Sequence, residues 1–215
     1  MANYGRVLTC LNPCDPQIVA QLLKDCVGRD ACIADIGCGR GTTLAWLSEH
    51  TDYMLFGTEP DRRLHDEALI NCPKVAIAHS RAEDLPFGDW VFDAAIMECV
   101  FSIVDDPAAA ICELNRIIRK NGVFLLTDLF TRGESDVSVG ESPLLRFLYT
   151  KNTINSLFMY GGFSLCGFYD RTLDMGSMIA QMFMDGVARD YIGDDTRKLL
   201  KRSSAGYGIW VFAKI

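Results

Sequence analysis

An acidic residue and three glycines at alternate positions form the motif of this chain best suited to chemistry. The motif consists of Asp35, Gly37, Gly39 and Gly41, with Cys38 inside it and Thr42 directly after it. Glycine adopts positive φ without steric cost and lets a ligand lie against the backbone. Free backbone N–H groups in such a turn, followed by a helix, attract nucleotide-like ligands. We therefore expect these six residues to bind a nucleotide-like cofactor.

A second candidate binding group is a carboxylate that follows the next apolar run of the sequence. Glu59 lies about twenty residues beyond the glycine turn, the spacing that two neighbouring parallel strands require. At the end of a strand it would accept two hydrogen bonds from a ribose diol, with Pro60 beside the same ligand. The alternative is a helix-starting acid, with Pro60 and Asp61 opening the next helix.

A competing interpretation of the glycines is the dinucleotide fingerprint G-x-G-x-x-G, which would make the chain a nicotinamide-dependent oxidoreductase using NAD(P). Counted from Gly37, that fingerprint requires a small residue where this chain has Thr42. The third glycine, Gly41, also falls one place early. The spacing therefore favours another nucleotide-like ligand over a dinucleotide.

Apolar runs alternate with helical patterns through the first part of the chain, and these elements must position both motifs. The expected strands are 31–36, 53–58, 74–79, 92–97 and 122–127, and the expected helices are 16–27, 42–49, 61–70 and 106–119. Strands that alternate with helices and read as continuous apolar runs indicate a parallel sheet covered on both faces. Ligands of such sheets bind beyond the carboxyl ends of the strands, where both motifs lie.

After residue 127 the pattern changes. The sequence predicts an exposed loop over 131–142, a helix over 143–160, a strand over 163–169, a Met-rich helical stretch around 175–184, a short helix over 194–202 and a final strand over 207–215. No internal repeat or linker interrupts the chain, so we expect one domain over 1–215. Within it, 1–30 would be an N-terminal helical segment and 171–205 a helical insertion between the last two strands.

Several segments together resemble class I S-adenosylmethionine (SAM) methyltransferases, in particular the group that includes the ubiquinone and menaquinone C-methyltransferases. The matching segments are the D-x-G-x-G-x-G loop, A-E-D-L-P-F at 82–87, V-F-D-A-A-I-M-E at 91–98 and the stretch 114–123, in which Asn121 replaces the family's proline. The resemblance implies an α/β fold with a Rossmann-like, doubly wound, seven-stranded sheet and an antiparallel last strand. The family joins strands six and seven by a short hairpin, and the insertion departs from that.

The same resemblance implies SAM as the cofactor and assigns further residues to it. In the family, the segment after the third strand closes over adenine, with the backbone amide of the residue matching Ala82 at the ring. Arg81 stands where the family often has an acid, so Glu83 is the substitute acceptor for the exocyclic amine. The end of the fourth strand, with Met97 and Glu98, would border the methionine part of SAM or the substrate.

Methyl transfer displaces an excellent leaving group from a sulfonium, so the protein mainly supplies proximity and alignment. A general base is needed only where the acceptor atom carries a proton. Glu98 and Asp128, both expected at strand ends, are the two candidate bases, and the catalytic residues are otherwise unassigned. No metal-ligand spacing is evident, so no metal is expected. The resulting prediction is a SAM-dependent methyltransferase, and the alternative is a SAM-binding accessory protein without turnover.

The amino-acid composition limits the kinds of substrate and partner that such a protein is expected to have. Of 215 residues, 21 are Lys or Arg and 28 are Asp or Glu, a formal charge of −7 without a dense basic cluster. Nucleic-acid substrates need a phosphate-neutralising surface, so we expect a small-molecule substrate instead. No apolar run approaches the roughly 18 residues of a membrane span. Nine cysteines, an odd number without a C-x-x-C pair, indicate a reducing cytoplasm.

We expect the substrate pocket to be walled by the segment around Tyr4, the strand exit at 98–101, the 128–150 region with Phe130, and the Met-rich stretch 175–184. Met178 and Met182, four residues apart, would there face an apolar or aromatic substrate.

Overall fold

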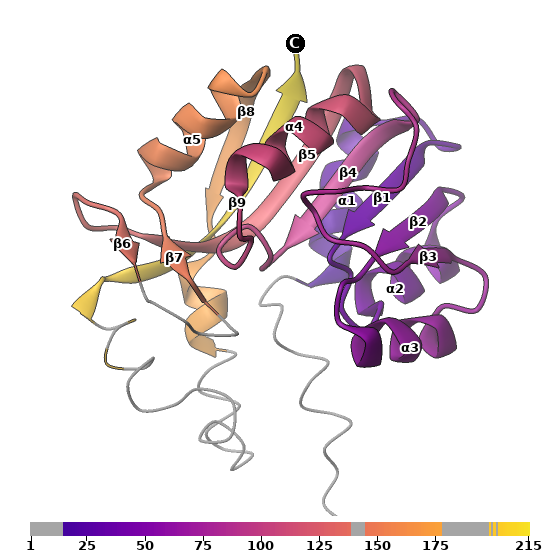
Figure 1. The fold of residues 1–215 in the computed structure, drawn as a ribbon, viewed down its shortest axis with the longest axis horizontal. Coiled ribbons are helices and arrows are strands. Elements are labelled where there is room, and N and C mark those ends of the chain that lie inside the picture. The colour runs from indigo at the N-terminus through magenta and orange to yellow at the C-terminus, as the bar shows by residue number, and fades with distance from the viewer. Residues whose placement is uncertain (1–14, 139–144, 178–197, 199, 201) are drawn as a thin grey trace, which may run out of the picture.

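The computed structural model describes residues 15–138, 145–177, 198, 200 and 202–215. A seven-stranded sheet in the order β3-β2-β1-β4-β5-β9-β8 runs through the molecule (Figure 1). Its strands are β1 (Cys32–Ile36), β2 (Met54–Thr58), β3 (Ala76–Ala78), β4 (Phe92–Glu98), β5 (Ile118–Thr131), β8 (Phe163–Asp170) and β9 (Ala205–Lys214). In this sheet β9 runs antiparallel to both of its neighbours, β5 and β8, whereas the other neighbouring pairs are parallel. The predicted α/β, Rossmann-like sheet with an antiparallel last strand is confirmed.

Helices cover both faces of the sheet. They are α1 (Pro16–Cys26), α2 (Thr42–His50), α3 (Arg62–Asn71), α4 (Pro107–Ile117) and α5 (Lys151–Tyr160). The buried residues of α1 and α2 pack on one face, which we call the α1 face, against alternate residues such as Ile33, Ile96 and Leu125. Those of α4 and α5 pack on the opposite face, the α4 face, against the residues in between, such as Phe124. The central strands therefore send alternate side chains to two separate cores.

The expected helix over 106–119 ends two residues early, and β5 begins directly at Ile118 rather than at residue 122. The pairing with β4 shifts within this stretch, because Phe92 lies opposite Ile118 but Ala94 lies opposite Val123. Asn121 adopts a φ of 62°, a left-handed conformation that bends the chain between the two registers. The predicted strand over 122–127 is thus the regular part of a longer, bulged strand.

The predicted helix over 143–160 is wrong in its first half. Phe147–Leu148 forms a short strand, β7, that pairs with β6 (Val137–Ser138) inside the predicted loop, and α5 begins only at Lys151. The backbone amides of Arg146 and Phe147 both donate to the carbonyl of Ser102, at 2.9 and 3.0 Å, and so hold this stretch extended.

The predicted insertion over 171–205 is described only in part. Residues 172–177 form a helical turn, and Met175 is buried in the core of the α1 face. Tyr4, Met178 and Met182, which the sequence places near a substrate pocket, lie outside the described residues, as do Cys10 and Cys14. Among the helices that the structure describes, none has the length and apolar character needed to cross a membrane.

Candidate functional site

The glycine loop between β1 and α2 has the backbone that its sequence predicts. Gly37, Gly39 and Gly41 have φ of 76°, 56° and 76°. A Cβ atom on Gly37 would lie 2.5 Å from a methyl carbon of Val100, so that position is closed by packing. A Cβ on Gly39 would meet no atom within 4 Å. The loop is therefore open at Gly39, where a ligand can approach the backbone.

The expectation of free N–H groups in this loop is wrong for four of its residues. The amides of Gly37 and Cys38 both donate to the carbonyl of Thr58 at 2.8 Å. The amide of Gly39 donates to the Glu59 carboxylate at 2.9 Å, and that of Gly41 to the Cys38 carbonyl at 2.8 Å. Because β2 ends beside the loop, the carbonyl of Thr58 and the carboxylate of Glu59 accept hydrogen bonds from the amides that a bound phosphate would need.

Glu59 lies at the tip of β2 and is only 6% exposed. Its Oε2 accepts from Gly39 and its Oε1 accepts from the amide of Asp61, the N-cap of α3, at 2.8 Å. Burial raises the pKa of this carboxyl, partly offset by those two amides. Each oxygen keeps a second lone pair for a ligand hydroxyl. Glu59 can therefore bind the start of α3 and a ribose at the same time. The exposed Pro60 lies next to it.

Three carboxylates meet where β1, β2 and β4 end. Asp35 is 2% exposed, and its pKa lies well above the ordinary value because it is buried beside the negative Glu98 and Glu59. The hydroxyl of Thr43, in the first turn of α2, donates to Glu98 Oε1 at 2.6 Å. Burial beside Asp35 and Glu59 also raises the pKa of the Cys38 thiol. Such a cluster favours a positively charged ligand.

The two residues that end β4 point to opposite faces. Met97 is fully buried in the core of the α4 face, so its predicted cofactor contact would have to come from its backbone. Glu98 lies on the α1 face, as its hydrogen bond with Thr43 requires. Cys99 then adopts a φ of 56° and ends the strand, while its amide donates to the Thr127 carbonyl at 2.7 Å.

Asp128, the other candidate base, is 1% exposed on the α4 face. Its carboxylate accepts from the amides of Ser102 and Leu129 at 2.8 and 2.7 Å. Burial raises its pKa to about 6 despite hydrogen bonds from Ser102, Leu129 and Phe101. With its oxygens used by the loop that follows β4, Asp128 positions that loop, and Glu98 is the better-placed base of the two.

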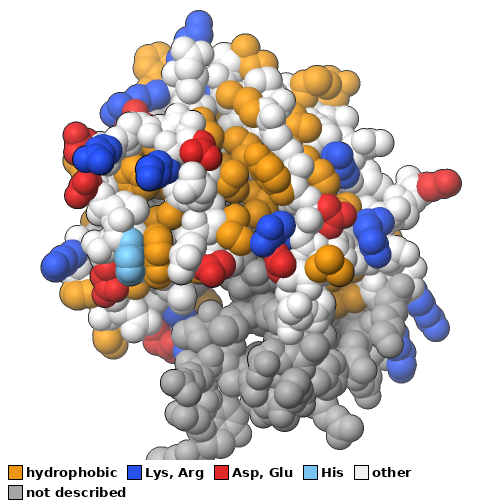
Figure 2. All heavy atoms as spheres, turned by 180° about the vertical axis from the view of Figure 1, so that it is seen from behind, with side chains coloured by type: hydrophobic (Ala, Val, Ile, Leu, Met, Phe, Trp, Pro, Cys, Tyr) orange, Lys and Arg blue, Asp and Glu red, His pale blue; other side chains and the backbone are white. Residues whose placement is uncertain are grey.

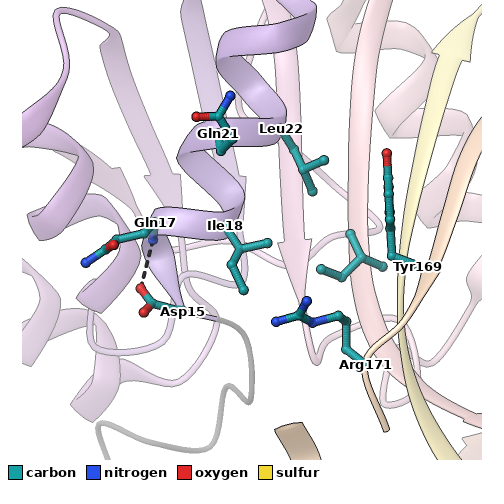
Figure 3. A pocket seen from close by; sticks show the side chains of 8 residues that line it. Asp15, Gln17, Ile18, Gln21, Leu22, Tyr169 and Arg171 are labelled. Carbon is teal, nitrogen blue, oxygen red and sulfur yellow. Dashed lines mark hydrogen bonds between the residues drawn. The ribbon is translucent and has the colours of Figure 1, made fainter. Parts of the chain in front are cut away.

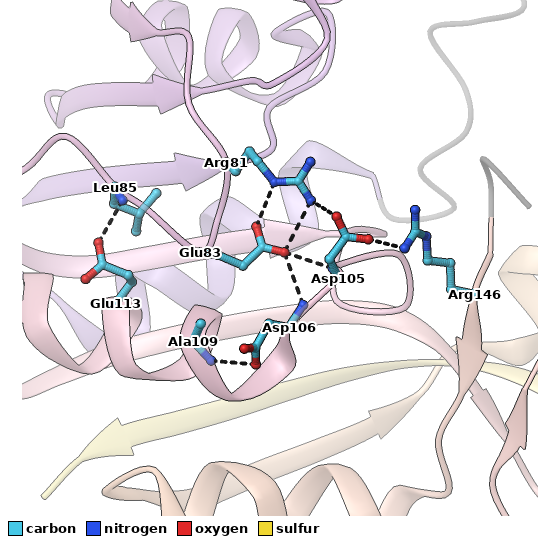
Figure 4. Close-up of polar contacts among 8 residues, drawn as sticks. All are labelled: Arg81, Glu83, Leu85, Asp105, Asp106, Ala109, Glu113 and Arg146. Carbon is cyan, nitrogen blue, oxygen red and sulfur yellow. Dashed lines mark hydrogen bonds and ion pairs between the residues drawn. The ribbon is translucent and has the colours of Figure 1, made fainter. Parts of the chain in front are cut away.

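The segment after β3 is held by a network of charges (Figure 4). Arg81 contacts the carboxylates of Glu83 and Asp105, and Arg146 contacts the same Asp105 carboxylate. Glu83 Oε1 also accepts from the amides of Asp105 and Asp106 at 2.8 and 3.3 Å. Burial raises the pKa of Glu83, but these amides and Arg81 outweigh it and leave the pKa below its ordinary value.

This network bears on the predicted adenine contacts. The Ala82 side chain is buried in the core of the α4 face, which fixes the backbone of this segment. Glu83 already accepts from several donors, and Arg81 points toward Asp105. The network thus ties together the segment after β3, the loop before α4 and the segment before β7, which sequence reasoning kept separate.

Two polar residues of this region escaped sequence analysis. Thr43, one place beyond the predicted loop, anchors Glu98. Thr127 is fully buried on β5, and its hydroxyl has no hydrogen-bond partner, which is rare for a buried polar atom. A threonine directly after the apolar run 123–126 is the signal that the sequence offered for it. Among the described residues, no three His, Cys, Asp or Glu side chains could together hold a metal ion.

A cavity of about 310 Å³ lies beside this region, between α1 and the strands β8 and β9 (Figure 3). Ile18 and Leu22 of α1 form one wall, and Tyr169 and Ile209 form the other. Figure 2 views the molecule from this side and shows hydrophobic side chains in the middle of the face, with acidic and basic side chains around them. Phe130, a predicted pocket residue, instead packs on the α4 face against Trp210 and Phe168.

Known proteins share both the motif region and the fold. Residues 34–126 match a family model described as a methyltransferase domain. A tRNA U34 carboxymethyltransferase of Campylobacter jejuni is 29% identical over 112 residues, which are 50% of this chain and 38% of the relative. An uncharacterised methyltransferase of Synechocystis is 28% identical over 100 residues, 45% of this chain and 46% of the relative. The chain therefore spans less than half the length of either relative.

Solved structures extend the likeness to the whole sheet. The [4+2]-cyclase SpnF superposes with a TM-score of 0.77 at 18% identity, covering 93% of this chain and 81% of its own. Geranyl diphosphate C-methyltransferase from Streptomyces coelicolor, solved with S-adenosyl-L-homocysteine, gives 0.72 at 14% identity, covering 93% and 76%. At such identities the likeness concerns the fold. The strand order, the acid–glycine loop and the domain match agree, and residues 34–126 are similar to the methyltransferase domain family.

Proposed function

We propose that this chain binds SAM at the glycine loop and transfers its methyl group to a small-molecule acceptor. The observation that carries the proposal is the cluster of Asp35, Glu59 and Glu98 around a loop that is open at Gly39. Burying Asp35 and Glu59 beside the partly buried Glu98 is costly unless positive charge compensates them. SAM carries a sulfonium and an ammonium group, and when bound it supplies an electrophilic methyl group.

Each carboxylate then has a distinct task. Asp35, buried at the end of β1, accepts from the ammonium of the methionine part. Glu59 uses its remaining lone pairs for the ribose hydroxyls, at the tip of β2. The backbone amide of Ala82 and the carboxylate of Glu83 lie along the segment expected at adenine. Glu98, held by Thr43, remains beside the position of the methyl group.

The same geometry disfavours the dinucleotide alternative. A pyrophosphate needs free amides at the loop and a positive potential around it. The amides of Gly37, Cys38 and Gly39 are used within the protein, and three carboxylates surround the turn. Phosphates placed there would be repelled by those carboxylates, whereas the cationic groups of SAM are attracted.

A small-molecule acceptor fits the charge of this chain better than a nucleic acid does. One relative is named as an enzyme of tRNA, but this chain carries a formal charge of −7 and no basic cluster. Where the acceptor atom carries a proton, Glu98 takes it as the new bond to the methyl carbon forms. The bond between that carbon and sulfur breaks, and its electron pair remains on sulfur.

Calorimetry tests the cofactor step. The wild-type protein is expected to bind SAM and S-adenosylhomocysteine with micromolar affinity and to gain thermal stability from either ligand. Asp35→Asn should weaken SAM binding by about 1.5–3 kcal/mol, the scale for a hydrogen bond to a charged group. Asp52→Asn, at an exposed position between α2 and β2, is the matched control and should bind as the wild type does. Tight NADH binding with no heat from either SAM ligand would overturn the proposal.

A further inference from the structure

The C-terminal end of α3 contacts the second half of the glycine loop. The side chain of Asn71, the last residue of this helix, donates from Nδ2 to the carbonyl of Arg40 at 3.0 Å. The thiol of Cys72, the C-cap of the same helix, donates to the carbonyl of Gly41 at 3.0 Å. Two consecutive residues at the end of α3 therefore hold the carbonyls of two consecutive residues of the loop.

Cys72 suits this contact by its protonation state and by its size. It is only 2% exposed, and burial, together with the nearby Asp35, raises the pKa of its thiol to about 11. The thiol therefore keeps its proton at neutral pH and can donate it to a hydrogen bond. A Cβ atom on Gly41 would lie 2.6 Å from Cys72 Sγ. The sulfur thus occupies the space that a side chain at position 41 would need, which brings the helix directly against the loop.

The two halves of the loop are held by different elements. The end of β2 accepts hydrogen bonds from the amides of residues 37–39. In the second half, Gly41 has a φ of 76°, and glycine has more backbone freedom to lose than any other residue. Gly41 is also the N-cap of α2 and accepts the first hydrogen bond of that helix, from the amide of Ala45 at 2.8 Å. The contacts from α3 therefore fix the point at which the loop becomes α2.

The other end of α3 contacts the acid that we propose to bind the ribose. The amide of Asp61, the N-cap of α3, donates to Glu59 Oε1 at 2.8 Å, and the amide of Gly39 donates to Glu59 Oε2 at 2.9 Å. A helix of 10 residues is about 15 Å long, so α3 links two distant contacts. It thereby ties the second half of the loop to the same acid that holds part of the first half.

We propose that Asn71 and Cys72 are positioning residues for the cofactor. They touch no part of the ligand and act through the carbonyls of Arg40 and Gly41, which they hold on the α3 side of the loop. With these carbonyls fixed, the loop keeps one conformation before SAM arrives, so binding does not have to order the glycine backbone. This inference rests on the proposed function, because it takes the loop and Glu59 as the SAM site.

Amide hydrogen exchange in the ligand-free, full-length chain tests whether α3 holds the loop. Asn71→Leu removes the donor at an exposed position of the helix. The amide of Gly41, which donates to Cys38, should then exchange at least about threefold faster than in the wild type, the scale of one lost hydrogen bond. The amide of Gly37, which Thr58 holds, should exchange at the wild-type rate. Unchanged exchange at Gly41 would contradict the proposal.

Calorimetry with S-adenosylhomocysteine tests the consequence for the cofactor. Asn71→Leu and Cys72→Ala should each weaken its binding about three- to tenfold. Cys72→Ser also lacks the sulfur but keeps a hydroxyl donor, so it should bind more tightly than Cys72→Ala. Glu67→Ala is the matched control on α3, because it removes only the partly exposed ion pair with the Arg40 side chain and leaves the loop carbonyls bonded.

The comparison of the two Cys72 variants separates positioning from packing. Both lose the sulfur, so a role in packing alone would give them the same affinity for S-adenosylhomocysteine. Equal affinities of these two variants, or wild-type affinity in folded Asn71→Leu, would overturn the proposal. Asn71→Leu, at its exposed position, keeps the test available if Cys72→Ala does not fold. If the wild type bound no S-adenosylhomocysteine, the proposed function would fail, whereas the exchange experiment needs no ligand and would still decide whether α3 holds the loop.

Discussion

The two faces of the sheet differ in what they bury. The α4 face is filled with aromatic rings, and Phe158 alone stacks on Phe212 and Phe124 at centroid distances of 4.6 and 5.1 Å. The α1 face has a mainly aliphatic core around the ring of Tyr207, the buried carboxylate of Asp35 and an unpartnered hydroxyl on Thr127. One face is closed by packing, whereas the other is polar where the strands end and opens into a cavity.

The residues that stabilise the fold and the residues proposed to bind the ligand therefore lie on opposite faces of the same sheet. Closely packed rings contribute large areas of buried apolar surface, so the α4 face stabilises the fold. Buried carboxylates without positive partners work against stability and favour a cationic ligand. Substitutions on the two faces should therefore have different signatures in unfolding and in ligand binding, which the following experiments measure.

The largest effect is expected from Phe158→Ala on the α4 face. The fully buried ring of Phe158 also contacts Phe101 and Phe163, so its removal leaves a cavity among four aromatic neighbours. We expect a loss of about 3–5 kcal/mol in the free energy of unfolding, measured by urea denaturation. Below the unfolding transition, the affinity for S-adenosylhomocysteine should be unchanged. A parallel loss of ligand affinity in the folded variant would break the separation between the faces.

The next effect is a pH dependence that comes from Asp128. Burial raises its pKa in the folded state to about 6, above the ordinary 3.8. The folded protein thus binds the Asp128 proton more tightly than the unfolded chain does. The free energy of unfolding that this proton contributes is present in full below about pH 4 and is lost as the pH rises through about 6. The loss is about 3 kcal/mol at about 1.36 kcal/mol per pKa unit. Urea denaturation of wild type and Asp128→Asn from pH 4 to 7 measures it, since the variant should lack this slope.

Glu59→Ala should act mainly on binding. We expect the affinity for SAM to fall by about 1.5–3 kcal/mol, because hydrogen bonds from the ribose to a charged group are lost. Isothermal titration calorimetry measures this change. Glu67→Ala, which removes only the partly exposed carboxylate that pairs with Arg40, is the control. An unchanged SAM affinity in Glu59→Ala would show that the ribose assignment is wrong.

The smallest effect concerns the start of α5, which covers the α4 face. The hydroxyl of Thr150 caps this helix by accepting from the amide of Thr153 at 3.1 Å. Thr150→Ala should cost about 1 kcal/mol of unfolding free energy and leave SAM binding unchanged. Thr150→Ser, which keeps the hydroxyl, should recover most of that loss in the same denaturation experiment.

The elements that carry the cofactor motifs were predictable because each is defined locally. Alternate glycines after a buried strand require a turn with positive φ, and Gly37, Gly39 and Gly41 have it. The carboxyl ends of parallel strands share one edge, so Asp35 and Glu59 had to come together. Their binding roles remain predictions, because the fold fixes only their positions.

Features set by distant residues could not be predicted. The amides of Gly37, Cys38 and Gly39 are taken by Thr58 and Glu59, partners some twenty residues away. Residues 147–148 are extended because the Ser102 carbonyl holds the chain just before them, although their own pattern suggests a helix. The register that places Glu98 opposite Thr127 and Ile209 opposite Tyr169 depends on the pairing of four strands, which a single sequence does not specify.

The position of β9 between β5 and β8 has a consequence for synthesis of the chain. Among the described elements of this sheet, β8 pairs only with β9, yet Asp170 at its end leaves the ribosome about 35 residues before Ala205. At roughly 5–20 residues per second, both β8 and the outer edge of β5 wait for seconds without a partner. Unpaired strand edges are templates for aggregation. Slower translation of residues 171–205 should therefore lower the soluble yield of the chain. A delay after β9 has paired with β5 and β8 should not lower it.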